Sequence, residues 1–122
     1  MVGISKRTNP TTTTDHEEDS IPYSNGLSDA ETERLALLAE ELMEAAQVAM
    51  KILRHGYVAT DNTSGVVYNN RSDLEIELGH VSNAIKLMAR NEDISLDRVE
   101  QAYQVKRRLI GKHLHHQDKT KL

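Results

Sequence analysis

Apolar side chains recur at helical spacing in three stretches of the chain, and segments rich in turn-forming residues separate them. The first stretch runs through residues 28–53, the second from about residue 70 or 72 to residue 90, and the third from about residue 96 to residue 113. A spacing of three or four residues places side chains on one face of an α-helix. The pattern therefore predicts three amphipathic helices and an all-α fold.

The ends of the first two predicted helices carry capping signals. Ser28 is followed three residues later by Glu31, and Ser72 is followed in the same way by Glu75. Each pair has the capping-box pattern, in which two side chains satisfy free backbone N–H groups at the start of a helix. Gly56 is a natural stop for the first helix.

The connections carry turn chemistry. Residues 56–70 contain several turn-forming pairs, and residues 66–68 favour a short extended piece. This connection is long for a simple link between helices, and long loops in compact domains are often functional. Residues 91–93 form a second turn, after which Ser95 caps the third helix.

The first predicted helix directs a carboxylate into its apolar face. At 100° per residue, Glu41 falls inside the apolar arc and Glu44 falls at its edge, while Glu40 lies further toward solvent. The arc itself consists of Leu38, Leu42, Ala45, Val48, Ala49, Ile52 and Leu53.

The second predicted helix repeats this arrangement. Glu77 falls inside its apolar arc, at the same relative angle as Glu41, and His80 falls at the edge in the position of Glu44. Asp73 lies on that edge one turn earlier. The arc consists of Leu74, Leu78, Val81, Ala84, Ile85 and Met88.

Carboxylates in a packed seam are costly unless they are paired, protonated or bound to metal. If the two helices pack antiparallel, Glu41, Glu44, Glu77 and His80 converge on one cluster. An oxygen-rich cluster suits Mg²⁺ or Mn²⁺, and a histidine among the oxygens favours Mn²⁺. A solvated acidic face and an internal salt-bridge network, with Arg34 paired to Glu41, are the two alternatives.

Composition narrows these possibilities. The chain has 122 residues, a formal charge of −4 and no cysteine. The acidic balance argues against a nucleic-acid partner, and any metal must be held by carboxylate, imidazole or amide groups. No apolar run is long enough to span a membrane. We expect a cytoplasmic protein, located in the host cytoplasm if a phage encodes it.

The predicted domain organisation has three parts. Residues 1–26 hold little to bury and are predicted to be a disordered tail, with an arm that packs on a neighbouring subunit as the alternative. Residues 27–117 form the helical domain, and residues 118–122 form a C-terminal tail. Because a helical domain of this size often completes its core by self-association, we expect a homodimer or homotetramer.

The sequence Glu-Glu-Leu-Met-Glu at residues 40–44, followed by Glu-Leu-Gly-His-Val at residues 77–81, resembles the MazG-like family of all-α nucleoside triphosphate pyrophosphohydrolases. That family carries an ExxE pair and then an ExxD pair. Glu41 and Glu44 match the first pair, while in the second pair His80 replaces the aspartate. The flanking sequences also resemble the short single-domain members found in bacteria and phages. These sequences are residues 33–41, residues 51–57 and the paired histidines at residues 115–116.

The resemblance implies a MazG-like helical bundle that works as an oligomer. In that family, two or three divalent ions bind a triphosphate and a water, which attacks the α-phosphorus to give the monophosphate and pyrophosphate. By this resemblance Glu41, Glu44 and Glu77 are direct metal ligands and His80 is the fourth. Glu40 holds a further ion or deprotonates the water, so Glu40 and Glu41 are the expected catalytic residues.

The sequence pattern marks the residues expected to contact the substrate less clearly than it marks the metal ligands. Lys51 and Arg54, beyond Glu44, are expected to meet the phosphates, as is Lys106 with its neighbours Arg107 and Arg108. Asn83 is a further polar candidate. A solvated basic face is the alternative for all the cations. The histidines His113, His115 and His116 form either a metal tract or a frayed helix end.

These residues do not indicate which nucleobase the substrate carries. Phage members of the short branch include MazZ-type enzymes that act on dGTP or GTP, and this resemblance favours a guanine nucleotide. The alternatives are a broad or pyrimidine-directed house-cleaning hydrolase acting on dCTP or dUTP, a non-catalytic nucleotide-binding helical module, and a divalent-metal-binding regulatory protein.

Overall fold

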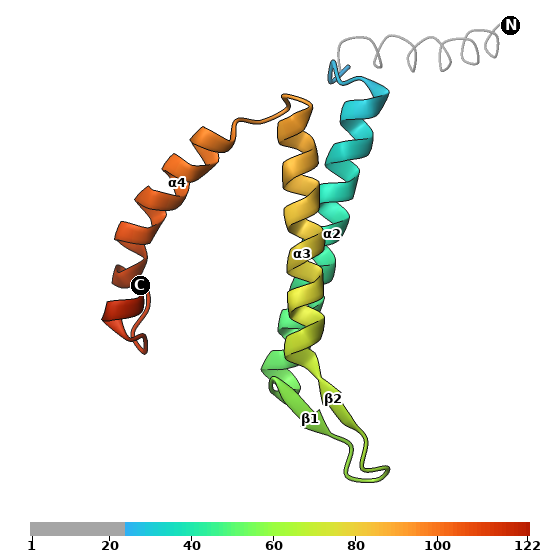
Figure 1. Ribbon diagram of the computed structural model, residues 1–122, viewed down its shortest axis with the longest axis vertical. Helices are drawn as coiled ribbons and strands as arrows, with labels where there is room; N and C mark the ends of the chain where they lie inside the picture. The colour runs from blue at the N-terminus through green and yellow to red at the C-terminus, as the bar shows by residue number, and fades with distance from the viewer. Residues whose placement is uncertain (1–23) are drawn as a thin grey trace, which may run out of the picture.

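The computed structural model describes residues 24–122, and within them the predicted all-α class is confirmed (Figure 1). Most of residues 1–26, predicted to be a disordered tail, lie outside the described residues. The elements in chain order are helix α2 (Asp29–His55), strands β1 (Val58–Thr60) and β2 (Val67–Asn69), helix α3 (Asn70–Arg90) and helix α4 (Leu96–Leu109), followed by short 3₁₀ turns at Ile110–Lys112 and Lys119–Lys121.

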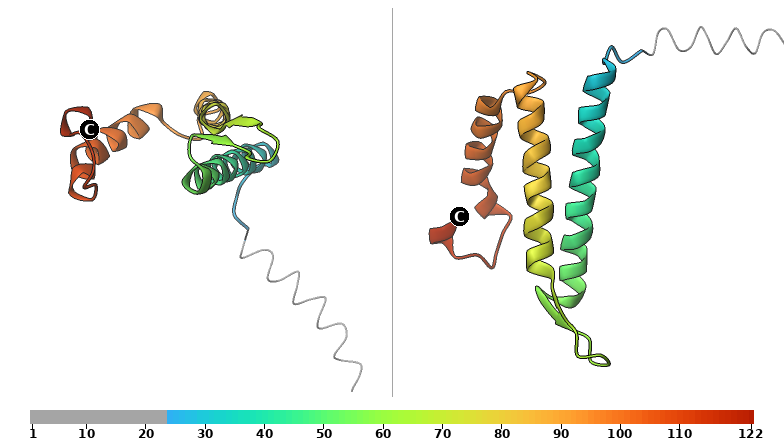
Figure 2. Two further views of the ribbon diagram at one scale, coloured as in Figure 1. Left: turned by 90° about the horizontal axis from the view of Figure 1, so that it is seen from below. Right: turned by 45° about the vertical axis from the view of Figure 1, so that its right-hand side comes forward.

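Helices α2 and α3 form an antiparallel hairpin and lie side by side along their length (Figures 1 and 2). The buried apolar side chains of the described residues are Ala45 on α2 and Ala84 and Met88 on α3. Two of these three are alanines, whose small side chains let neighbouring helices approach closely. The interface between α2 and α3 therefore buries few apolar side chains. The predicted acidic residues Glu41 and Glu77 lie near the middle of this interface.

The predicted limits of α2 are confirmed. The Ser28 hydroxyl accepts the N–H of Glu31 at 3.1 Å, and the Glu31 carboxylate accepts the N–H of Ser28 at 2.8 Å, which completes the capping box. At the other end Gly56 has a φ of 89°, and its N–H donates to the Ile52 carbonyl at 2.7 Å. A positive φ is favourable for glycine, so this residue ends the helix.

One predicted capping box and one predicted helix end are wrong. Helix α3 begins at Asn70, one of the two predicted starts, but it is capped by Asn69, whose side chain accepts the N–H of Ser72 at 3.1 Å, so the expected Ser72–Glu75 capping box does not form. Ser72 already lies in the first helical turn because the asparagine before it starts the helix. Helix α4 ends at Leu109 and tightens into a 3₁₀ turn, short of the predicted residue 113.

The connection between α2 and α3 is a β-hairpin. Val58 pairs with Asn69, and Thr60 pairs with Val67. The extended piece predicted at residues 66–68 is present one residue further on, whereas its partner strand was not predicted. Asn70 is buried at the base of the hairpin, where its side-chain N–H donates to the Gly56 carbonyl at 3.0 Å. This bond ties the end of α2 to the start of α3.

At the opposite end, an ion pair ties α2 to the turn that follows α3. The guanidinium of Arg34 contacts the Asp93 carboxylate through two nitrogens, at 2.5 Å and 2.9 Å, and both side chains are largely buried. The hydrogen bond from Arg34 holds the pKa of Asp93 below its ordinary value. The α2–α3 hairpin is thus fastened at both ends, by an amide at one and by an ion pair at the other.

Helix α4 stands apart from the hairpin (Figures 1 and 2). All fourteen of its residues are exposed, including Leu96, Val99 and Tyr103. In the described part of the chain no helix has the length and apolar character needed to cross a membrane.

The Arg34–Asp93 ion pair predicts a pH-dependent contribution to stability. Because the folded-state pKa of Asp93 lies below its unfolded value, the stabilisation is fully present above that unfolded value, about 3.9, and is lost as the pH falls through the folded-state pKa. Asp93→Asn should lower the Tm by several degrees at pH 7, and the difference from the wild type should vanish in acid. Thermal melts from pH 2 to pH 7 measure this.

Glu92→Gln is the matched control, because Glu92 is the adjacent acidic residue and is exposed. Equal Tm losses in Asp93→Asn and Glu92→Gln would show that the ion pair does not fasten the turn.

Candidate metal centre

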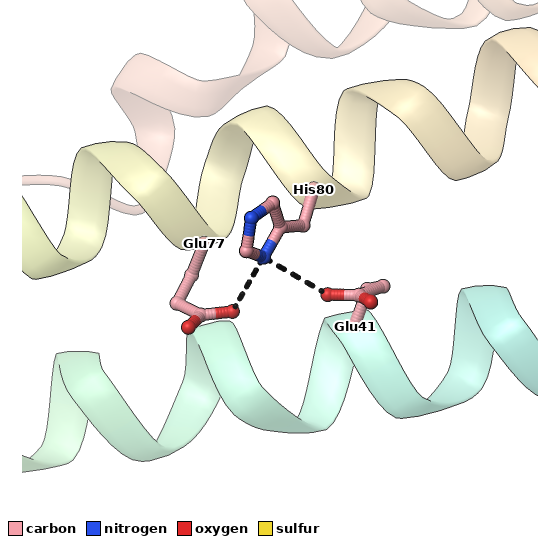
Figure 3. A group of neighbouring side chains, drawn as sticks. All are labelled: Glu41, Glu77 and His80. Atoms are coloured by element: carbon pink, nitrogen blue, oxygen red, sulfur yellow. Dashed lines mark ion pairs between the residues drawn. The ribbon is translucent and has the colours of Figure 1, made fainter.

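The antiparallel hairpin brings three of the predicted metal ligands together (Figure 3). Glu41 projects from the middle of α2, while Glu77 and His80 project from consecutive turns of α3. Positions three residues apart lie on one face of a helix, so Glu77 and His80 reach the seam side by side. We refer to these three residues as the Glu–Glu–His group.

The distances within this group suit a metal ion. His80 Nδ1 lies 3.4 Å from Glu77 Oε2 and 3.5 Å from Glu41 Oε2. One potential ligand atom from each residue lies within 4.8 Å of the others. Mg²⁺ binds its ligands at about 2.0–2.1 Å, so ligands on opposite sides of an ion are about 4.2 Å apart. The three side chains therefore fit around one small divalent cation.

Burial makes the two carboxylates unusual. The side chains of Glu41 and Glu77 are 14% and 21% exposed, and the Oε2 atom of each is buried without a hydrogen-bond partner. A desolvated carboxylate oxygen without a donor is unfavourable, and a cation between the two oxygens would remove that cost. His80 is 52% exposed, so this side of the group is open to solvent.

Glu44 lies beside the group without joining it. Its carboxyl has a pKa raised above the ordinary value, first by partial burial and then by the negative charges of Glu41, Glu77 and Glu40. Interaction with the Glu77 side chain adds to the shift. The negative charges of three neighbouring carboxylates thus disfavour the ionisation of Glu44. Glu40 itself is exposed, as the helical wheel predicted.

The nearby cations are engaged elsewhere. Arg34, the expected partner of Glu41 in a salt-bridge network, binds Asp93 instead. Asp73 lies on the edge that also carries His80, but it pairs with Lys51 at 3.1 Å. Within residues 24–122, the ion pairs that involve the two buried carboxylates are those with His80. The expected pairing of Arg34 with Glu41 is therefore wrong, because Arg34 binds Asp93 in the turn after α3.

The expected phosphate contacts do not gather at the Glu–Glu–His group. Lys51 and Arg54 lie two to three turns beyond Glu44 and line a groove along α2. Asn83 is exposed on α3. Lys106 lies on α4, which stands apart from the hairpin (Figure 1). In a single chain Arg54 and Lys106 are thus separate from the ligands they were expected to assist, whereas Asn83 stands one turn after His80 on the same helix.

Sequence reasoning missed a cavity at the base of the β-hairpin. Its volume is about 370 Å³, and its lining includes Lys51, His55, Tyr68 and Asn70. The cavity depends on the pairing of β1 with β2, and strands of three residues are too short to show a clear alternating pattern. The available signal was the polar pair Asn69–Asn70, which indicates a turn followed by the start of a helix.

The histidines near the C-terminus remain separate. His113, His115 and His116 are exposed, and within residues 24–122 they do not join a group of three ligands. This arrangement agrees with a solvated end rather than a metal tract.

Comparisons of the chain with protein-family models, with curated proteins and with solved structures gave no match. The function is therefore inferred from the chemistry of the Glu–Glu–His group and its surroundings.

The buried carboxylate oxygens of Glu41 and Glu77, which accept no hydrogen bond, predict that divalent cations stabilise the fold. An ion at 100 times its Kd stabilises a protein by about 2.7 kcal/mol. Mn²⁺ and Mg²⁺ should therefore raise the Tm, a chelator should reverse the effect, and Glu77→Gln should abolish it. Thermal melts with and without metal measure the shift.

Glu75→Gln serves as the control, because Glu75 is exposed on the same helix. It should keep the full metal response. A Tm that neither metal raises in the wild type would count against this site.

Proposed function

We propose that the chain is a metal-dependent nucleoside triphosphate pyrophosphohydrolase, which converts a ribo- or deoxyribonucleoside triphosphate to the monophosphate and pyrophosphate. The observation that carries the proposal is the pair of buried carboxylate oxygens of Glu41 and Glu77, which accept no hydrogen bond and whose ion pairs, within residues 24–122, are with His80. They meet across two antiparallel helices beside an imidazole that is open to solvent. This arrangement suits a cation that also binds a ligand from the solvent side.

Glu41, Glu77 and His80 would bind the ion, and the neighbouring carboxylate of Glu44 would serve as a further ligand. A bound divalent cation neutralises phosphate charge and lowers the pKa of an attacking water. Positive charge near Glu44 would also offset the effect of the neighbouring carboxylates on its pKa.

The proposed reaction is a substitution at the α-phosphorus. The water oxygen forms a bond to this phosphorus, and the bond to the oxygen that bridges the α- and β-phosphates breaks. Pyrophosphate leaves with the electron pair of that bond, and the water proton passes to a carboxylate. Glu40 is exposed beside the group, where it can accept this proton. A guanine nucleotide is the preferred substrate on the strength of the MazZ-type resemblance.

His80 sets the proposed choice of metal. A neutral imidazole provides one nitrogen and no charge, whereas the aspartate of the family pattern provides oxygen and a negative charge. Mg²⁺ strongly prefers oxygen ligands, and Mn²⁺ accepts imidazole more readily. The proposed enzyme therefore works better with Mn²⁺ than with Mg²⁺.

The proposal includes self-association into a MazG-like bundle. The buried apolar side chains of the described residues are Ala45, Ala84 and Met88 alone, and none of the large ones is fully buried. A core this small does not offset the conformational entropy lost on folding. The exposed apolar side chains on α2 and α3, which include Leu42, Met43, Met50, Leu53, Ile76 and Leu78, supply the surface that a second copy would cover.

Product analysis tests the reaction. Purified protein incubated with each nucleoside triphosphate should release monophosphate and pyrophosphate in equal amounts, resolved by ion-exchange chromatography. Glu41→Gln should lower kcat/KM by more than about 100-fold, because even outer partners of metal ligands contribute 10- to 100-fold, while Glu75→Gln should remain active. Release of inorganic phosphate in place of pyrophosphate would refute the proposed chemistry.

The His80 position provides a second functional test. His80→Asp restores the acidic pattern and should raise activity with Mg²⁺ relative to activity with Mn²⁺. Steady-state rates of the wild type and the variant under each metal give the two ratios. An unchanged ratio would mean that His80 does not ligate the ion. No turnover by the folded wild type under either metal would favour a non-catalytic nucleotide-binding module.

A further inference from the structure

The spacing of atoms in the Glu–Glu–His group distinguishes between kinds of cation. His80 Nδ1 lies 3.4 Å from Glu77 Oε2 and 3.5 Å from Glu41 Oε2, and these are the two oxygens that accept no hydrogen bond. A hydrogen bond from nitrogen to oxygen spans about 2.7–3.2 Å, so both separations are longer. The spacing is thus that of ligands around a shared ion rather than that of a directly bonded pair.

These separations match a four-coordinate ion better than a six-coordinate one. Bonds of about 2.0–2.1 Å to Mg²⁺ place neighbouring octahedral ligands about 2.9 Å apart and opposite ones about 4.2 Å apart. Zn²⁺ binds nitrogen and carboxylate oxygen at about 2.0–2.2 Å in tetrahedral geometry, which places any two ligands about 3.3–3.5 Å apart. The observed 3.4 Å and 3.5 Å lie in the tetrahedral range and between the two octahedral values.

The ligand types favour the same ion. Sites that contain nitrogen bind Zn²⁺ more tightly than Mn²⁺, and Mg²⁺ prefers oxygen throughout. Reactive zinc sites commonly have three protein ligands and leave the fourth position to a water or a substrate. Here two carboxylates and one imidazole provide the three, and the 52% exposure of His80 leaves that side open to solvent.

The other histidines of the described residues do not compete for this role. His55, His113, His115 and His116 are exposed, and within residues 24–122 none of them joins a group of three potential metal ligands. The histidine that lies among carboxylates there is His80, so the nitrogen ligand that favours zinc is placed at the Glu–Glu–His group.

Coordination number decides what an ion in this group can do. An octahedral ion held by three side chains keeps three further positions, whereas a tetrahedral Zn²⁺ held by the same side chains keeps one. The proposed reaction requires phosphate oxygens and an attacking water at the metal together. One open position does not provide for both, so Zn²⁺ occupies the group without supporting the reaction.

We infer that the Glu–Glu–His group is a zinc-selective site, and that Zn²⁺ bound there excludes the activating ion and inhibits the protein reversibly. His80 determines the selectivity because it supplies nitrogen where an aspartate would supply oxygen. The zinc site rests on the spacing and chemistry of the three ligands, whereas the inhibition rests on the proposed function.

Cobalt tests the geometry. Co²⁺ replaces Zn²⁺ in proteins, and its visible absorption is intense in tetrahedral sites and weak in octahedral ones. Untagged, metal-free protein should give the intense spectrum with one equivalent of Co²⁺, and Zn²⁺ should abolish it. The triple variant His113→Gln, His115→Gln, His116→Gln is the control and should give the same spectrum. A weak octahedral spectrum, or an intense one that disappears in the control, would overturn the site.

Calorimetry tests the role of His80. His80→Asp keeps three ligands and replaces nitrogen with oxygen, so Zn²⁺ should bind at least about tenfold more weakly while Mg²⁺ binds no more weakly than before. Titration of the wild type and the variant with each metal gives the two Kd ratios. Equal weakening of both metals, or an unchanged ratio, would show that His80 does not select zinc.

Activity measurements separate the zinc site from its effect. Wild type loaded with Mn²⁺ should lose most of its triphosphate hydrolysis when one equivalent of Zn²⁺ is added, and a chelator followed by fresh Mn²⁺ should restore it. Zinc binding by a protein that hydrolyses no triphosphate would retain the zinc site and refute the proposed function. Hydrolysis that Zn²⁺ leaves unchanged or increases would retain the function and overturn the inhibition.

Discussion

The close antiparallel contact between α2 and α3 is the constraint on which the rest of the structure depends. Small side chains such as Ala45 and Ala84 let the helices approach, and the same approach removes water from the carboxylates between them. The contact therefore buries few apolar side chains, and it holds two desolvated carboxylate oxygens that accept no hydrogen bond. Its fastening at both ends, by Asn70 and by the Arg34–Asp93 pair, holds these carboxylates together against their mutual repulsion.

The residues that stabilise the hairpin are distinct from those of the Glu–Glu–His group, and the positively charged side chains lie away from the centre of the hairpin. An arginine beside Glu41 would neutralise the carboxylate and stabilise the chain at the expense of cation binding. Arg34 instead stabilises the turn after α3, and Lys51 pairs with Asp73 nearer to the β-hairpin. The charges that secure the fold lie on either side of the Glu–Glu–His group, which leaves its negative charge available.

Much of this arrangement was predictable from sequence because helical periodicity is a local property. The limits of α2 and the convergence of Glu41, Glu77 and His80 followed from spacing and antiparallel packing. The choice of Asp93 as the partner of Arg34 was not predictable, because it depends on where a turn 59 residues away comes to lie. Strand β1 and the detachment of α4 were missed for a related reason, since both depend on contacts that no local pattern specifies.

The hydrogen bond between the Asn70 side chain and the Gly56 carbonyl has a consequence for how this fold can vary. It sets the longitudinal alignment of the two long helices at the base of the β-hairpin, before the chain reaches the turn that begins at Asp61. Residues added at that turn lengthen a surface excursion and leave the alignment intact, whereas one residue added within either helix rotates the following side chains by about 100°. The hairpin tip is thus free to diversify in length and shape while the spacing of the acidic side chains stays fixed.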